Sequence, residues 1–327
     1  MRRREFIALV GGAAAAWPVS VCAQQAAMPV IGFLGSASPD LWADRLRAFH
    51  QGLNDNGFVE SRNVKIAYGW AEDLNARFPA LVDDMVRRQV TVIAAGSLAA
   101  ALAAKAATKT IPIVFAMAAD PVDVGLVVSL NRPGGNATGA TNLNEEILPK
   151  RFELLHEVLP ASKSLALLIN PTVQAQANIQ SRQGHAAARA LGRQLHILHA
   201  SAEADFEAVF TALGKLQAGG LVIGSDPFFT SRREQVAALT VRYAIPAVYQ
   251  YREYAMAGGL MSFGGSLTNM YRLTGLYIGR ILKGEKPADL PVQQATKAEL
   301  IINLKTANAL GINIPLPLLG RADEVIE

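Results

Sequence analysis

Polar side chains follow several short apolar runs of this sequence, at the positions where the runs end. These residues are Ser36, Ser38, Ser97 and Asp120 in the first half of the chain and Asn170, Thr172 and Asp226 in the second half. Hydroxyl, amide and carboxylate groups hydrogen-bond small polar ligands, and the same residue types also cap helices. Both roles stay open for each residue, because a cap and a ligand contact can use the same side chain.

Aromatic residues accompany these polar positions in the sequence. They are Trp42, Phe228, Phe229, Tyr249, Tyr251 and Phe263. An aromatic ring can stack on the flat face of an aromatic or sugar ligand, but aromatic side chains more often fill the core. We include Tyr249 and Phe263 among the candidate binding residues and keep core packing as the alternative.

Motifs typical of common enzymes are missing from the sequence. It contains no G-x-S-x-G, H-E-x-x-H or P-loop pattern, and its only cysteine is Cys22. His196 and His199 lie three apart in an expected strand, so they point to opposite faces and cannot chelate one metal ion. The sequence therefore favours a binding protein without cofactor or metal over an enzyme.

The elements that must position these residues are short apolar runs alternating with longer, alanine-rich segments. The runs cover residues 30–36, 64–70, 90–97 and 111–117, and then 164–171, 195–201, 220–227 and 245–251. The fourth run of each half begins with Ile-Pro, and a Gly-Gly pair precedes a fifth run in both halves. Strands alternating with helices indicate parallel sheets. The repeated order predicts an α/β protein with two similar lobes, each a doubly wound parallel sheet.

Ligands of open parallel sheets bind beyond the carboxyl ends of the strands. Two such lobes facing each other place both sets of strand-end loops along one cleft. We therefore expect the polar residues named above to line a cleft between the lobes.

Composition and charge exclude some classes of partner. Hydrophobic residues make up 51% of the 327 residues and charged residues 18%, which is typical of a well-buried globular protein. The formal net charge is only +4, and no basic stripe with interleaved aromatics occurs. Nucleic acid is therefore not an expected partner.

Residues 1–23 read as a secretory signal peptide. Three arginines precede a run of 13 residues, 7–19, that consists of apolar residues, glycine and one proline. A membrane anchor needs roughly 20 apolar residues, so this alternative is weaker. Cleavage after Ala23 removes Cys22, whereas lipidation of Cys22 is the less favoured alternative, because Val21 is bulkier than the residue that usually precedes a lipidated cysteine. The arginine pair also resembles a twin-arginine signal, and either export route predicts a periplasmic protein.

Five segments in order resemble one family. They cover residues 94–106, 111–127, 134–142, 224–229 and 281–293. The chain resembles, over residues 28–327, ABC-transporter substrate-binding proteins of the type I periplasmic fold, in the branch that binds aromatic amino acids. The resemblance implies a hinge of three crossings between a lobe of residues 28–142 plus 265–287 and a lobe of residues 143–264 plus 288–327.

The resemblance also implies roles for two residues. Ser97, at a helix N-terminus, matches a hydroxyl residue that helps to hold a carboxylate, and Asp226 matches an acidic residue that pairs with an ammonium group. Where relatives have a glutamate after the first strand of the second lobe, this chain has the neutral residues 170–174. That departure leaves room for a less basic ligand.

The function that the resemblance implies is capture of a small molecule for an ABC importer. We expect an aromatic or branched-chain amino acid as ligand, an inner-membrane permease as partner, and a monomer. A ligand-binding sensor of the same fold is the alternative, and a periplasmic enzyme is a weaker one.

Overall fold

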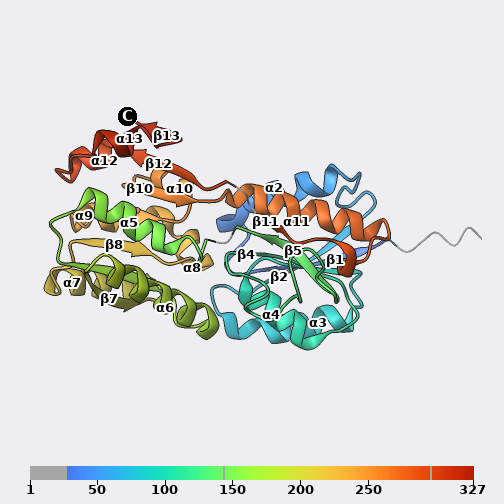
Figure 1. Ribbon diagram of the computed structural model, residues 1–327. Helices are drawn as coiled ribbons and strands as arrows, with labels where there is room; N and C mark the ends of the chain where they lie inside the picture. Colours follow the sequence, from blue (N-terminus) through green and yellow to red (C-terminus); the bar gives the residue numbers. More distant parts are fainter. Residues whose placement is uncertain (1–27, 143, 295–296) are drawn as a thin grey trace, which may run out of the picture.

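The computed structural model describes residues 28–142, 144–294 and 297–327 (Figure 1). The expected signal peptide and Cys22 lie outside these residues. Two lobes are visible, each built around its own sheet with helices on both faces. The two-lobed, doubly wound α/β fold expected from the sequence is therefore confirmed.

The first lobe contains a six-stranded sheet. Its strands in spatial order are β11 (Gln293–Gln294), β5 (Ala137–Thr141), β4 (Ile113–Met117), β3 (Val92–Ala95), β1 (Val30–Gly35) and β2 (Lys65–Trp70). Its helices are α2 (Ala43–Asn54), α3 (Phe78–Arg87), α4 (Leu98–Ala107) and α11 (Leu267–Leu282), with 3-10 turns η1 (Asp40–Trp42), η2 (Asn75–Arg77) and η3 (Pro287–Asp289). The central strands β3 and β4 are buried at every residue, as expected for parallel strands covered by helices on both faces.

The second lobe contains a seven-stranded sheet. Its strands in spatial order are β13 (Glu324–Ile326), β12 (Glu299–Asn303), β10 (Met261–Gly264), β9 (Ala247–Tyr249), β8 (Gly220–Ile223), β6 (Ser164–Ile169) and β7 (Gln194–His199). Its helices are α5 (Leu148–Val158), α6 (Gln174–Ala190), α7 (Asp205–Lys215), α8 (Pro227–Ser231), α9 (Arg233–Arg242), α10 (Arg252–Met256), α12 (Leu304–Ala309) and α13 (Leu316–Leu319). β10 and β12 pair antiparallel, whereas the other pairings of this sheet are parallel.

The chain crosses between the lobes three times. The crossings lie between β5 and α5, between β10 and α11, and between β11 and β12. Gln293 and Gln294 still pair with β5 of the first sheet. The last crossing therefore follows residue 294, later than the boundary at residue 288 expected from the sequence, because the segment after η3 adds a short edge strand before it leaves the first lobe.

Helix α11 returns from the second lobe and packs closely along α2. A Cβ atom at Gly52 would lie 1.9 Å from the carbonyl oxygen of Arg272, and one at Gly275 would lie 2.1 Å from the carbonyl oxygen of Phe49. Glycine at these two positions therefore lets the two backbones touch. This contact holds the C-terminal half of α2 against α11.

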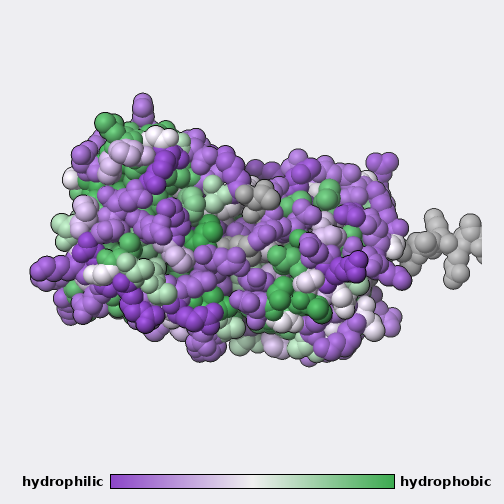
Figure 2. Space-filling view, viewed as in Figure 1, coloured by the Kyte–Doolittle hydropathy of each residue, from purple (hydrophilic) through white to green (hydrophobic). Residues whose placement is uncertain are grey.

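The outer surface is mainly polar. Figure 2 shows hydrophilic residues over most of one face, with hydrophobic residues scattered between them. Within the described ranges, no helix combines the length and the apolar character needed to cross a membrane.

Candidate functional site

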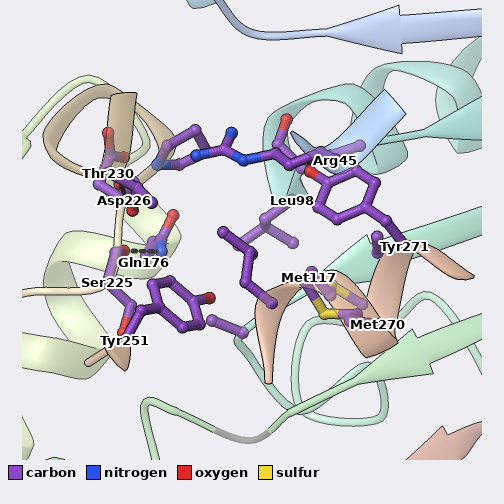
Figure 3. Close-up of a pocket in the computed structure, with 16 residues that line it drawn as sticks. Arg45, Leu98, Met117, Gln176, Ser225, Asp226, Thr230, Tyr251, Met270 and Tyr271 are labelled. Carbon is purple, nitrogen blue, oxygen red and sulfur yellow. Dashed lines mark hydrogen bonds between the residues drawn. The ribbon is translucent and has the colours of Figure 1, made fainter. Parts of the chain in front are cut away.

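A cavity of about 40 Å³ lies between the two lobes, beside a second one of about 10 Å³ (Figure 3). Both are bordered by Ser97, Leu98, Gln176, Asp226 and Pro227, so they form one continuous site. The walls come from loops at the carboxyl ends of β3, β4 and β8 and from helices α2, α6 and α11. This is the place where open parallel sheets bind ligands.

Asp226 is the acidic residue that borders both cavities. It is buried at the N-terminus of α8, and its Oδ1 accepts hydrogen bonds from the backbone N–H of Phe228 at 2.8 Å and from Nδ2 of Asn170 at 3.1 Å. Burial raises the pKa of Asp226 to about 6, although these two hydrogen bonds oppose the shift. Because both bonds use Oδ1, Oδ2 keeps acceptor capacity for a ligand cation.

Asn170 and Thr172 have different positions relative to the cavity. Asn170 borders the smaller cavity, and its Oδ1 accepts hydrogen bonds from the backbone N–H of Thr172 at 3.0 Å and from the Thr172 hydroxyl at 2.8 Å. Thr172 is exposed at the rim, where its Oγ1 accepts a hydrogen bond from Nδ2 of Asn75 in the first lobe at 3.0 Å. Thr172 therefore links the lobes rather than lining the cavity.

Ser36 and Ser97 both border the site from the first lobe. Ser97 caps α4, because its Oγ accepts a hydrogen bond from the backbone N–H of Ala100 at 3.2 Å. The hydroxyl hydrogen of Ser97 remains able to donate to a ligand. Ser36 is buried beside the smaller cavity. For Ser97 the structure thus shows the cap and leaves the ligand contact as a prediction.

Besides Thr172, four of the residues predicted from the sequence do not border the cavity. Ser38 is half-buried beyond β1, and Asp120 accepts a hydrogen bond from the backbone N–H of Val122 at 2.7 Å within a turn. The ring of Tyr249 is fully buried and stacks on Tyr254 at 4.6 Å. Phe263 packs against the core of the second lobe. Both aromatic residues lie within strands and face helices, so core packing describes them better than ligand stacking.

Other residues of the site were not predicted from the sequence. They are Arg45, Leu98, Met117, Gln176, Thr230, Met270 and Tyr271. Tyr251 also borders the cavity, although the sequence analysis named it only as a nearby aromatic residue. Arg45 had a readable signal, because it lies three residues after Trp42 and four before Phe49 on the buried stripe of α2. Met270 and Tyr271 lie on α11, and only its return to the first lobe brings them to the site.

A buried polar cluster supports the wall near Asp226. Gln180 donates hydrogen bonds from Nε2 to the carbonyl oxygen of Ser225 at 2.9 Å and to Oε1 of Glu145 at 3.4 Å, and Gln176 donates to the same carbonyl oxygen. Burial raises the pKa of Glu145 to about 8. The second lobe thus places a carboxyl group behind the cavity although residues 170–174 are neutral.

The remaining walls are mainly apolar. Leu98, Met117, Leu267, Met270 and the rings of two tyrosines face the cavity. Among the described residues, no group of three or more His, Cys, Asp or Glu side chains is arranged to hold a metal ion. In the described part of the chain, the site therefore combines the cation Arg45 with two acidic residues, Asp226 and the Arg232-paired Asp73, beside apolar and uncharged polar walls.

Comparisons with known proteins found similarity over most of this chain. The curated "Tyrosine-binding protein" of Clostridioides difficile (strain R20291) is 27% identical over 265 residues, which cover 81% of this chain and 75% of that protein. A solved structure of a conserved domain protein from Vibrio cholerae has a TM-score of 0.81 at 26% identity, and one of an ABC domain in complex with L-Trp from Streptococcus pneumoniae has a TM-score of 0.80 at 24% identity. Each covers 91% of this chain and 99% of the solved chain.

The family comparison covers nearly all of the described chain. Residues 38–326 match the family described as "ABC transporter substrate binding protein". The match includes the whole second sheet, the first sheet apart from β1, all three crossings and every residue that borders the cavities apart from Ser36. The chain therefore belongs to the ABC transporter substrate-binding protein family.

Proposed function

We propose that this protein captures an amino acid with an aromatic or branched apolar side chain and delivers it to an inner-membrane ABC permease. The observation that carries this proposal is the buried carboxyl group of Asp226 in the wall of an apolar cavity between two lobes. An ammonium group is a suitable partner for Asp226, because a charge-assisted hydrogen bond is strong in a site with little water.

The apolar walls suit the side chain of such a ligand. Met117 and Met270 face the cavity together with Tyr251 and Tyr271 (Figure 3). Methionine side chains are flexible and make favourable contacts with aromatic rings. A cavity of about 40 Å³ holds little more than water, so entry of an amino acid requires the lobes to separate and these methionines to move.

The relatives support the same ligand class. One is named a tyrosine-binding protein, and a solved structure of the same fold holds L-Trp. The expected signal peptide, residues 1–23, supports delivery from the periplasm. Cell fractionation and intact-mass measurement test this location, and we expect a mature chain that begins at Gln24. A chain that begins with acylated Cys22 would show a lipid-anchored protein instead.

The experiment on Asp226 uses Asp226→Asn with Asp120→Asn as the matched control. Calorimetry on a panel of aromatic and branched amino acids should identify a ligand for the native protein. Loss of one partner of a buried charge pair costs several kcal/mol, so Asp226→Asn should weaken that ligand by about a hundredfold or more. Asp120 lies outside the cavity, so its variant should bind normally. An unchanged affinity in Asp226→Asn would exclude the proposed ammonium contact.

A further inference from the structure

Arg45 is a buried cation in the cavity wall that the first lobe contributes. Only 4% of it is exposed, and it borders the cavity from helix α2. Within the described part of the chain, no carboxylate oxygen lies within 4 Å of its guanidinium nitrogens. Figure 3 shows its side chain extending along the cavity from the side of Tyr271 toward Asp226 and Thr230. Its charge acts on the Asp226 and Asp73 carboxylates from beyond ion-pair distance, so the buried guanidinium still lacks an anion in direct contact.

Aromatic rings hold the guanidinium in place. Its Cζ lies 4.5 Å from the ring centroid of Trp42 and 6.0 Å from that of Tyr271. The two rings meet edge to face at 5.5 Å, and the Tyr271 hydroxyl donates a hydrogen bond to the carbonyl oxygen of Gly96 at 2.7 Å. Rings beside the face of a guanidinium leave its edge, with the N–H donors, free to point elsewhere.

We propose that Arg45 binds the carboxylate of the ligand, so that the site selects molecules with a free carboxylate beside an apolar body. This inference rests on the proposed amino-acid function and adds its missing anionic contact. A guanidinium edge matches a carboxylate with two parallel hydrogen bonds. The Ser97 hydroxyl borders the same cavity and can donate to the same group. Arg45 and Asp226 together then recognise the two charges of an amino acid.

The test compares ligands that differ only at the carboxylate. L-Tyrosine and L-tryptophan are measured by calorimetry beside L-tyrosinamide and L-tryptophanamide, which keep the ammonium group and the ring. Arg45→Met retains bulk beside Trp42 without the charge, and Arg45→Lys retains the charge without the planar fork. Arg47→Met is the control, because Arg47 is 77% exposed on the same helix.

The expected result is a loss confined to the acids. Removing one partner of a buried charge pair should weaken tyrosine or tryptophan by about 30-fold or more in Arg45→Met, with a smaller loss in Arg45→Lys. The amides should bind the native protein weakly and should change little in either variant. Arg47→Met should bind all four probes like the native protein. Circular dichroism and thermal unfolding establish that each variant is folded, and Arg45→Lys carries the comparison if Arg45→Met does not fold.

Other outcomes separate this inference from the function it rests on. If Arg45→Met weakens binding of the acids and the amides equally, or weakens binding of neither class, the carboxylate contact is overturned while the amino-acid function stays intact. Failure of the native protein to bind amino acids, together with Arg45-dependent binding of 3-(4-hydroxyphenyl)propionate, would overturn the amino-acid function and retain the carboxylate contact. Absence of binding by every carboxylate probe would overturn both.

Discussion

An ion pair across the cleft joins the two lobes beside the ligand cavity. Nη2 of Arg232, at the end of α8, lies 2.7 Å from Oδ2 of Asp73, in the loop after β2. The two side chains are 15% and 17% exposed. Arg232 also donates from Nε to Oε1 of Glu203 at 2.8 Å and lies over the ring of Phe228 at 4.6 Å, both in its own lobe. Of these three contacts of Arg232, the one with Asp73 is the one that must break when the lobes separate.

The strength of this pair follows from its partial burial. Exposed ion pairs contribute about 0.2–1 kcal/mol, and breaking a fully buried pair costs about 3–5 kcal/mol. A value of about 2 kcal/mol for the Arg232–Asp73 pair lies between these limits and corresponds to roughly a 30-fold change in an equilibrium constant. The effect applies only to the closed form, because separation of the lobes returns Asp73 to water and leaves Arg232 with its contacts to Glu203 and Phe228.

The assay is a double-mutant cycle on ligand affinity and dissociation rate. Arg232→Gln, Asp73→Asn and the double variant are compared with the native protein, and Arg233→Gln serves as control because Arg233 pairs with Glu234 in its own lobe. We expect the ligand to dissociate roughly 30-fold faster from Arg232→Gln, with little change in association rate. Asp73→Asn should have a smaller effect, because Arg232 keeps its contact with Glu203.

A coupling free energy below about 0.5 kcal/mol would place the pair among ordinary surface contacts. Equal losses in Arg232→Gln and Arg233→Gln would point to general surface charge instead of a contact across the cleft. Either result would remove this ion pair from the account of closure.

Two further predictions concern pH and packing. Burial raises the pKa of Asp226 from 3.8 to about 6. Ionisation of Asp226 therefore lowers the stability of the folded protein as the pH rises through this window, whereas an ammonium ligand binds the ionised form. Amino-acid affinity measured by calorimetry should therefore fall about tenfold from pH 7 to pH 5, and a flat profile would contradict the ammonium contact. Gly275→Ala places a Cβ atom 2.1 Å from the carbonyl oxygen of Phe49 and should lower the melting temperature by several degrees, whereas Gly214→Ala, with open space on α7, should raise it slightly. Equal changes in melting temperature in Gly275→Ala and Gly214→Ala would show that α2 and α11 tolerate separation.

Strands β1–β10 could be predicted because each is a short apolar run bounded by helical segments, whereas β11, β12 and β13 were not among the runs identified from the sequence. The same pattern placed Asp226 and Asn170 at strand ends, and both border the cavity. Tyr249 and Phe263 illustrate the limit of this reasoning. A strand presents side chains to both faces of its sheet, and sequence position does not say which face is turned toward the other lobe.

Arg45 shows what tertiary packing adds to the sequence. Its place at the cavity depends on the contact of α2 with α11, which begins more than 200 residues later in the chain. A charged residue on an otherwise buried helix stripe was a visible signal, but its partners Trp42 and Tyr271 meet only through the second crossing. The helix pair thus determines a ligand contact that no local motif contains.

The two charged contacts proposed for the ligand come from different lobes, and this division couples binding to closure. Asp226 belongs to the second lobe and Arg45 to the first, so only the closed form offers both groups to one molecule. A ligand shifts a two-state equilibrium only by its difference in affinity for the two states, and about 5.5 kcal/mol is needed to move it from 1:99 to 99:1. The Arg232–Asp73 pair of about 2 kcal/mol forms in the closed state with or without ligand, so it sets the starting ratio of the two forms and supplies none of that difference. The ligand must supply all of it, which is the condition for a closed form that reports an occupied site.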